Sequence, residues 1–456
     1  MKKLLKMMFL SLSLTALLMT AAFAAEGERV RVAVIDSGVS SAAISADALA
    51  EGANYIKPEE STEDRVGHGT AVVSLIVGSE RAGVSGVCPE AEVVPMVFYT
   101  ASRSGLQTAG DTTMMAQMIL DAIDIYSCDI INISACGNVD DEAVRNAIAY
   151  AEEKGVLVVA AAGNEGKSEA RYPAQYDSVL CVGSVDETLR NAAKFSNDNA
   201  AVDVVAPGVD LTVSAMSGAA KKQSGTSFST AYITGLAAKL MTEYPDLSAA
   251  QVRQIICASA EDLMTPGHDN STGWGVVTAE DTLAFAAEGR QFRDVKAKDW
   301  FFAGAKTMAD LGLMNGMDAV NFAPQRETTH AMLWTMLYRM DGRTASANAA
   351  SWYADAQQWV MDSKISKGDN PNGIITRGEI VHAMWRYAIY KGMDVTGVSG
   401  DLSAYSDAAS VSGETAQAMQ WACGAGVING INGALAAGGN TTRAQIATIL
   451  ARFLSL

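Results

Sequence analysis

Between residues 30 and about 260, short apolar runs alternate with stretches of helical periodicity. The apolar runs lie near residues 30–35, 92–98, 129–134, 156–161, 179–183 and 202–205. The helical patterns lie near residues 69–77, 111–126, 140–154, 228–243 and 248–258. Strands that alternate with helices pair in parallel, because each helix carries the chain back along the sheet. The sequence therefore predicts an α/β fold with a doubly wound, mainly parallel sheet that helices cover on both faces.

Two polar residues adjoin apolar elements of this region. Asp36 ends the run 32–36 and precedes a Ser-Gly pair, so we expect it at the carboxyl end of a buried strand. Open α/β sheets place their functional sites at that edge. His68 opens an apolar helical stretch in the segment Gly67-His68-Gly69-Thr70. Each residue also has a purely structural explanation, Asp36 as a turn former or helix cap and His68 as a core histidine.

Two further segments supply a hydroxyl and an amide. Ser227 is predicted to lie in the first turn of a helix that follows a Ser-Gly-Thr turn. A serine hydroxyl is a weak nucleophile at neutral pH and needs a base beside it. Asn164 follows an apolar run in a small-residue loop, where its amide can donate a hydrogen bond to an oxyanion. A serine, a histidine, a carboxylate and an amide in these contexts together indicate a serine hydrolase.

These four segments, in the order Asp, His, Ser, resemble the subtilisin-like serine proteases, or subtilases. The resemblance covers residues from about 29 to 287 and is supported by the motifs Tyr172-Pro173-Ala174, Phe195-Ser196-Asn197 and Gly273-Trp274-Gly275. It implies that Ser227 is the nucleophile, His68 the general base and Asp36 the carboxylate that orients the base. It also implies that Asn164 and the backbone N–H of Ser227 form the oxyanion hole.

The same resemblance implies where a substrate lies and where this chain departs from the family. The substrate would contact Ser134, Ala135, Cys136, Ala161 and Gly163. Cys136 stands where the family commonly has glycine, so we expect a narrowed specificity pocket. Glu165 would lie at its rim, either solvated or favouring a basic substrate residue. Ala231 stands where the family usually has proline, which removes no reacting group.

We predict that the protein requires no metal and no cofactor. The loop at residues 78–84 lacks the asparagine ligands of the family's tight calcium site, and calcium prefers six to eight oxygen ligands. We therefore predict no metal site, while calcium elsewhere in the chain stays an alternative. The six cysteines have no zinc-like spacing and are either buried thiols or disulfides.

The N-terminal segment and the net charge bear on localisation. Residues 1–24 carry three lysines, an apolar stretch and the sequence Ala22-Phe23-Ala24, which predicts a signal peptide cut after Ala24. The peptidase domain is then expected over 25–287, without the pro-segment that secreted relatives usually carry. No later stretch is long enough to cross a bilayer. The net charge of −17 argues against nucleic-acid binding and against an anionic membrane surface.

Residues 288–456 contain internal repeats in short helices, at about 290–341, 347–392 and 402–456. Two copies open with similar motifs, Phe292-Arg293-Asp294-Val295 and Tyr405-Ser406-Asp407-Ala408. The copies resemble S-layer homology modules, which in that family bind secondary polymers of the bacterial cell wall. The resemblance implies that Arg377 and Arg443 contact the polymer, whereas His330 replaces the arginine in the first copy. The alternative is a helical domain that serves packing or protein contacts.

Together these features predict a secreted, cell-wall-associated serine endopeptidase that acts on proteins or peptides. Its second partner would be a cell-wall polysaccharide. One alternative is a catalytically weak or inactive wall-associated binding protein on a subtilase scaffold. Another is a maturation protease dedicated to one secreted precursor.

Overall fold

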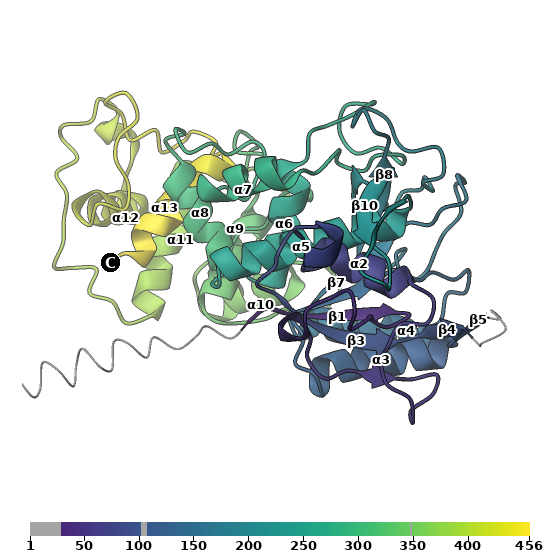
Figure 1. Ribbon diagram of the computed structural model, residues 1–456. Coiled ribbons are helices and arrows are strands. Elements are labelled where there is room, and N and C mark those ends of the chain that lie inside the picture. The colour runs from purple at the N-terminus through teal and green to yellow at the C-terminus, as the bar shows by residue number, and fades with distance from the viewer. Residues whose placement is uncertain (1–28, 102–106, 347–348) are drawn as a thin grey trace, which may run out of the picture. The chain divides into compact units, whose positions relative to one another are not determined.

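The computed structural model describes residues 29–101, 107–346 and 349–456 (Figure 1). The predicted signal peptide lies outside these residues. The chain divides into two compact units, residues 1–283 and 284–456. The predicted domain boundary after residue 287 lies four residues beyond this division, at the end of helix α7 (Ala279–Ala287). Each unit is described by itself.

The first unit is built on a seven-stranded sheet with the order β2-β3-β1-β6-β7-β8-β9. Every neighbouring pair in this sheet is parallel. The strands are β1 (Arg31–Asp36), β2 (Ala53–Asn54), β3 (Glu92–Val97), β6 (Ile130–Ile133), β7 (Leu157–Ala161), β8 (Leu180–Val185) and β9 (Val204–Pro207). All six apolar runs became strands of this sheet, which confirms the predicted parallel α/β fold.

Helices cover both faces of the sheet, as predicted. They are α2 (His68–Ile76), α3 (Thr112–Asp124), α4 (Glu142–Glu153), α5 (Thr226–Glu243) and α6 (Ala249–Ser259). Ile35 of β1 belongs to the same buried cluster as Ile119 of α3 and Ile148 of α4. Successive side chains of a strand point to opposite faces. Asp36 therefore faces the other side of the sheet, where α2 and α5 pack (Figure 1).

Some short elements were not predicted. Two antiparallel hairpins pair β4 (Tyr99–Ala101) with β5 (Gln107–Ala109), and β10 (Leu211–Ser214) with β11 (Ala220–Gln223). Three 3₁₀ turns lie at Ala46–Ala48, Glu80–Ala82 and Ala408–Ser410. All six cysteines are free thiols, and four of them are buried. This result favours buried thiols over disulfides.

The second unit consists of three helix pairs. The pairs are α8 (Phe302–Asp310) with α9 (His330–Met340), α10 (Ala354–Asp362) with α11 (Arg377–Tyr390), and α12 (Gly413–Gly424) with α13 (Arg443–Leu454). A threonine caps the second helix of each pair, because its side chain accepts a hydrogen bond from a backbone N–H in the first turn. The predicted middle copy, 347–392, follows the same plan as the other two.

Backbone hydrogen bonds close the three pairs into a ring. Thr328 N donates to Thr441 O at 2.9 Å, Thr441 N donates to Ile375 O at 3.2 Å, and Ile375 N donates to Thr328 O at 2.9 Å. The second helix of each pair packs against the first helix of another, α9 on α10, α11 on α12 and α13 on α8. The unit therefore has an internal, approximately threefold arrangement.

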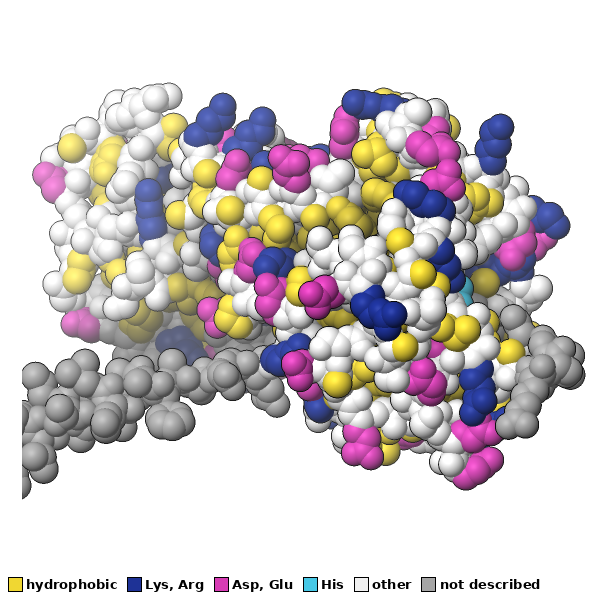
Figure 2. Space-filling view, viewed as in Figure 1, with side chains coloured by type: hydrophobic (Ala, Val, Ile, Leu, Met, Phe, Trp, Pro, Cys, Tyr) yellow, Lys and Arg dark blue, Asp and Glu magenta, His cyan; other side chains and the backbone are white. Residues whose placement is uncertain are grey.

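On the face shown in Figure 2, Lys and Arg side chains lie among Asp and Glu side chains. Among residues 29–101, 107–346 and 349–456, no helix combines the length and apolarity needed to cross a bilayer.

Candidate active site

The carboxylate and imidazole predicted to work together are in contact. Asp36 ends β1 and is fully buried, whereas His68 is the first residue of α2. The Nδ1 atom of His68 lies 2.9 Å from both carboxylate oxygens of Asp36. The hydroxyl of Tyr99 also lies 2.8 Å from Asp36 Oδ1 and 2.6 Å from His68 Nδ1. With Nδ1 held in this way, Nε2 is left to act as a base.

A second buried carboxylate holds the turn from which His68 emerges. Asp64 accepts hydrogen bonds from five donors: Ser37 Oγ, the backbone N–H groups of Val66, Gly67 and Thr70, and Thr70 Oγ1. Gly67 caps α2 with a φ of 89°, a conformation that disfavours other residues. Asp64 therefore acts as the anchor that fixes the start of α2, and with it the imidazole.

The electrostatic surroundings favour the charged imidazole. Burial disfavours the imidazolium form, but the charge and hydrogen bond of Asp36 outweigh burial and raise the pKa of His68 above its usual range. The charge of Asp64 acts in the same direction, and Lys221 opposes it. A base whose conjugate acid is stabilised in this way retains a proton more readily during a reaction.

Ser227 lies in the first turn of α5 and is nearly buried, with 6% of its surface exposed. The preceding Gly225 has a φ of 153°, which produces the sharp entry into the helix. The Ser227 hydroxyl donates to the carbonyl of Ser134 at 3.4 Å. The ring of neighbouring Phe228 lies 5.6 Å from the His68 ring. Among the described residues no hydrogen bond joins the Ser227 hydroxyl to His68, and contacts of this kind are often long in sites without substrate.

The amide of Asn164 is oriented by the residue that precedes Ser227. Its Oδ1 accepts hydrogen bonds from Thr226 N at 2.8 Å and Thr226 Oγ1 at 2.9 Å. Asn164 is exposed, and its Nδ2 donors have no protein acceptor among the residues that the structure describes. These donors are therefore available to an oxygen atom of a substrate next to the start of α5.

The predicted substrate-binding residues come from two neighbouring parallel strands. Ser134, Ala135 and Cys136 follow β6, whereas Ala161 ends β7 and Gly163 follows it. The Ser134 carbonyl faces the Ser227 hydroxyl, and Cys136 is exposed. These residues thus lie beside the candidate nucleophile at one edge of the sheet.

A buried arginine, which the sequence analysis missed, lies beside Gly163. The side chain of Arg171 is 9% exposed and donates to Glu165 at 3.1 Å and to Glu169 at 3.0 Å. A Cβ atom placed on Gly163 would lie 3.0 Å from Arg171 Cγ and 2.9 Å from Glu165 Oε2. The Arg171–Glu165 pair therefore packs directly against this glycine and occupies space next to it.

Glu165 is not merely a solvated rim residue. Burial opposes its ionisation, but hydrogen bonds from Asn197 and Arg171 outweigh that effect and lower the pKa of Glu165. Asn197 Nδ2 donates to the carboxylate at 2.7 Å. Since Arg171 neutralises the Glu165 charge, the expectation that Glu165 attracts a basic substrate residue loses its support.

Arg377 and Arg443, the predicted polymer ligands, are buried at the starts of α11 and α13. Arg377 donates to the carbonyls of Leu435 and Asn429 at 3.0 and 2.6 Å. Arg443 donates to the carbonyls of Phe322 and Asn315 at 2.7 and 2.6 Å. Both guanidinium groups thus tie loops together. Their contact with a polymer stays a prediction, although Arg377 also lines a cavity of about 240 Å³ with Trp300 and Arg452.

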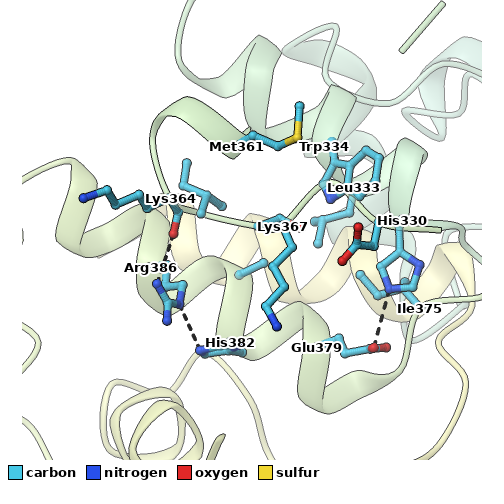
Figure 3. A pocket seen from close by; sticks show the side chains of 14 residues that line it. His330, Leu333, Trp334, Met361, Lys364, Lys367, Ile375, Glu379, His382 and Arg386 are labelled. Carbon is cyan, nitrogen blue, oxygen red and sulfur yellow. Dashed lines mark hydrogen bonds and ion pairs between the residues drawn. The ribbon is translucent and has the colours of Figure 1, made fainter. Parts of the chain in front are cut away.

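His330 occupies the corresponding position in the first helix pair, and a larger cavity of about 780 Å³ opens beside it (Figure 3). His330 Nδ1 bonds the Gly373 carbonyl at 3.0 Å, and its Nε2 lies 3.5 Å from Glu379. Lys367 extends toward His382 and Glu379 (Figure 3). The cavity is lined by five basic or imidazole side chains and two carboxylates: His330, Lys364, Lys367, His382, Arg386, Asp369 and Glu379.

Tyr99, Asp64 and Arg171 are the site residues that sequence reasoning missed. Asp64 carried a usable signal, because it lies four residues before His68 in a turn-like segment. Tyr99 directly follows an apolar run, as Asp36 ends one, but the pairing of β3 with β1 was needed to bring them together. Arg171 precedes the Tyr172-Pro173 motif and carried no comparable signal.

Comparison with known proteins identifies both units. The Subtilase family model (Peptidase_S8) matches residues 27–275, and the S-layer homology domain model matches 291–331 and 404–447. Subtilisin DY of Bacillus licheniformis is 33% identical over 263 residues, 56% of this chain and 91% of that protein. Subtilisin Savinase of Lederbergia lenta is 34% identical over 256 residues, 56% of this chain and 90% of that protein. The solved protease domain of a PatA mutant aligns with a TM-score of 0.51 at 26% identity, covering 57% of this chain and 96% of that domain.

Proposed function

Because the chain belongs to the subtilase family of serine endopeptidases and carries S-layer homology repeats, we propose that it hydrolyses peptide bonds through an acyl-enzyme on Ser227. The observation that supports this most strongly is the hydrogen bond between His68 and the buried Asp36, close to the first turn of α5 that contains Ser227. Asn164, with Nδ2 directed away from Thr226, supplies the remaining group that the reaction needs.

The steps follow from these positions. His68 Nε2 takes the Ser227 proton as the hydroxyl oxygen attacks the substrate carbonyl carbon, and Asp36 stabilises the resulting imidazolium. Asn164 Nδ2 and the Ser227 N–H donate to the oxyanion, and the start of α5 adds its positive dipole end. The C–N bond then breaks while His68 protonates the leaving amine. Water attacks the Ser227 ester, with His68 again taking and returning a proton. The three side chains supply this chemistry themselves, so we expect activity to persist in EDTA.

Replacing Ser227 with alanine tests this proposal. Ser227→Ala is expected to abolish both peptide hydrolysis and labelling by a fluorophosphonate. Ser217→Ala, which changes an exposed serine of the same unit, is the matched control and is expected to retain both. Folded wild-type protein that is never labelled would instead favour the wall-associated binding protein without activity.

The surroundings of Gly163 support a preference for small residues on the acyl side of the cleaved bond. Arg171 and Glu165 fill space on one side of this glycine. On the segment after β6, Cys136 carries a side chain where the family commonly has glycine. Profiling against a peptide library measures this preference. Broad cleavage after small residues supports a general endopeptidase, whereas cleavage of a single sequence supports the dedicated maturation protease.

We further propose that the protein is exported and that its repeats bind an anionic polymer of the cell wall. The cavity beside His330 supports this, because two carboxylates line it together with Lys364, Lys367 and Arg386, the last of which pairs with Glu414. Lys367 is exposed, and no acidic partner for it occurs among the described residues. Lys367→Ala in the full chain is expected to reduce co-sedimentation with purified cell walls. Lys306→Ala, which changes a lysine paired with Asp310, is the control. Sedimentation unchanged by Lys367→Ala would contradict this choice of cavity.

A further inference from the structure

Tyr99 lies two residues beyond the end of β3, a strand that pairs with β1. Val97, the last residue of β3, is the register partner of Asp36, and Phe98 N donates to the Asp36 carbonyl at 2.7 Å. The main chain therefore carries Tyr99, the first residue of β4, past the end of β1. This places an aromatic residue with a polar tip against the Asp36 side chain.

The hydroxyl of Tyr99 contacts both members of the Asp36–His68 pair. It lies 2.8 Å from Asp36 Oδ1 and 2.6 Å from His68 Nδ1. Burial and the charge of Asp36 raise the pKa of Tyr99 well above its usual value, so the phenol stays protonated. A neutral phenol has one proton to donate, and a carboxylate only accepts. The proton therefore goes to Asp36, and a lone pair of the phenol oxygen faces the N–H of His68 Nδ1.

The ring of Tyr99 also restricts the imidazole. The ring centroids of Tyr99 and His68 are 6.0 Å apart, and that of Phe228 lies 5.6 Å from His68. Two aromatic side chains from different elements thus contact the same imidazole. Besides Asp36, the charged groups that act on the imidazole are Asp64, before α2, and Lys221, on β11.

We propose that Tyr99 is a positioning residue, whose hydroxyl bridges the Asp36 carboxylate and the His68 Nδ1–H and holds them in the geometry needed for proton transfer. The bridge fixes the tautomer, because Nδ1 faces acceptors only and Nε2 is left free to accept the Ser227 proton. The hydrogen bond that the Tyr99 hydroxyl donates to Asp36 also weakens the attraction of that carboxylate for the imidazolium proton of His68. This role rests on the proposed hydrolysis by Ser227.

Tyr99→Phe removes the hydroxyl and keeps the ring. We expect kcat to fall about tenfold, as for loss of one well-placed hydrogen bond in the transition state, with KM little changed. We also expect the acidic limb of kcat/KM to shift, because Tyr99→Phe removes both an acceptor that faces His68 Nδ1–H and a donor that weakens the attraction of Asp36 for the imidazolium. Tyr55→Phe is the matched control, because its hydroxyl donates to Asp121 at 2.7 Å outside the catalytic set. It is expected to leave the acidic limb unchanged.

NMR of the imidazole protons provides a second test that does not need turnover. The chain has four histidines, so the Nδ1 proton of His68 can be assigned in labelled protein. This resonance is expected to move in Tyr99→Phe and to stay in place in Tyr55→Phe.

The outcomes separate the two proposals. Suppose that the wild-type protein is active. If Tyr99→Phe then changes neither the acidic limb nor the His68 resonance, the role of Tyr99 alone is overturned. Wild-type protein that is neither labelled nor hydrolytic would overturn the proposed hydrolysis, and the resonance would still report whether the bridge exists.

Discussion

Removing the Arg171 side chain should widen the specificity pocket. In Arg171→Ala the Arg171 side chain beside Gly163 is lost, while Glu165 and Asn197, which also pack against this glycine, keep their hydrogen bond to each other. The space left is that of a long side chain of which only 9% is exposed in the wild type. A large apolar substrate residue could then be buried there instead of being excluded.

The size of the effect follows from the burial that becomes available. Burying a Phe or Leu side chain stabilises a complex by about 1.5–3 kcal/mol relative to leaving it exposed. Each 1.4 kcal/mol corresponds to a factor of ten. The ratio of kcat/KM for a Phe substrate to that for an Ala substrate should therefore rise roughly 10- to 100-fold. Loss of the arginine also leaves two carboxylates near the pocket, so acidic substrates should become poorer.

The assay compares matched peptides that differ only at the residue before the cut. Arg190→Ala, which removes an arginine 67% exposed and paired with Glu261, is the control and should leave the ratio unchanged. Thermal unfolding of each variant shows whether the fold is intact. A folded, active Arg171→Ala protein with an unaltered Phe-to-Ala ratio would refute the reasoning that Arg171 limits the pocket.

Three other expectations follow from single contacts. His68 must be neutral to accept a proton, and its pKa is raised. In a pH–rate profile, kcat/KM should therefore fall as the pH decreases, with a midpoint above the ordinary histidine pKa of about 6.5. Asp64→Asn replaces an acceptor of five hydrogen bonds with a group that has one acceptor oxygen, so the free energy of unfolding in urea should fall by about 3 kcal/mol. His330→Arg should partly fill the cavity beside α9 and weaken co-sedimentation with cell walls severalfold, without lowering peptide hydrolysis.

The parallel sheet and its helices were predictable because both signals are local. Six of the seven strands are short apolar runs, and each covering helix has a helical period, so neither signal depends on knowing its partner. The two-residue strand β2 has no such run and was not predicted. The β4–β5 and β10–β11 hairpins were missed because their strands are three or four residues long and partly exposed. Such segments are stabilised by pairing rather than by an apolar pattern that can be recognised along the chain.

The candidate site was predictable only in part for a related reason. Asp36 ends β1, His68 begins α2, Ser227 lies in the first turn of α5 and Asn164 follows β7 in a loop, and these contexts are recognisable in the sequence. Tyr99 acts on Asp36 through the register between β3 and β1, which no local pattern specifies. Arg171 lies in an irregular segment, and its importance comes from the absence of a side chain at Gly163. Residues whose roles depend on another segment's geometry thus required the structure.

The repeats show how one substitution can change the use of a repeated fold. At equivalent positions, Arg377 and Arg443 reach two backbone carbonyls each and so close the space between neighbouring loops. His330 is shorter and bonds a single carbonyl, that of Gly373. The cavity beside His330 is about 780 Å³, against about 240 Å³ beside Arg377. The copy that departs from the repeat at this position therefore has a larger cavity than the one beside Arg377, which favours the cavity beside His330 for binding.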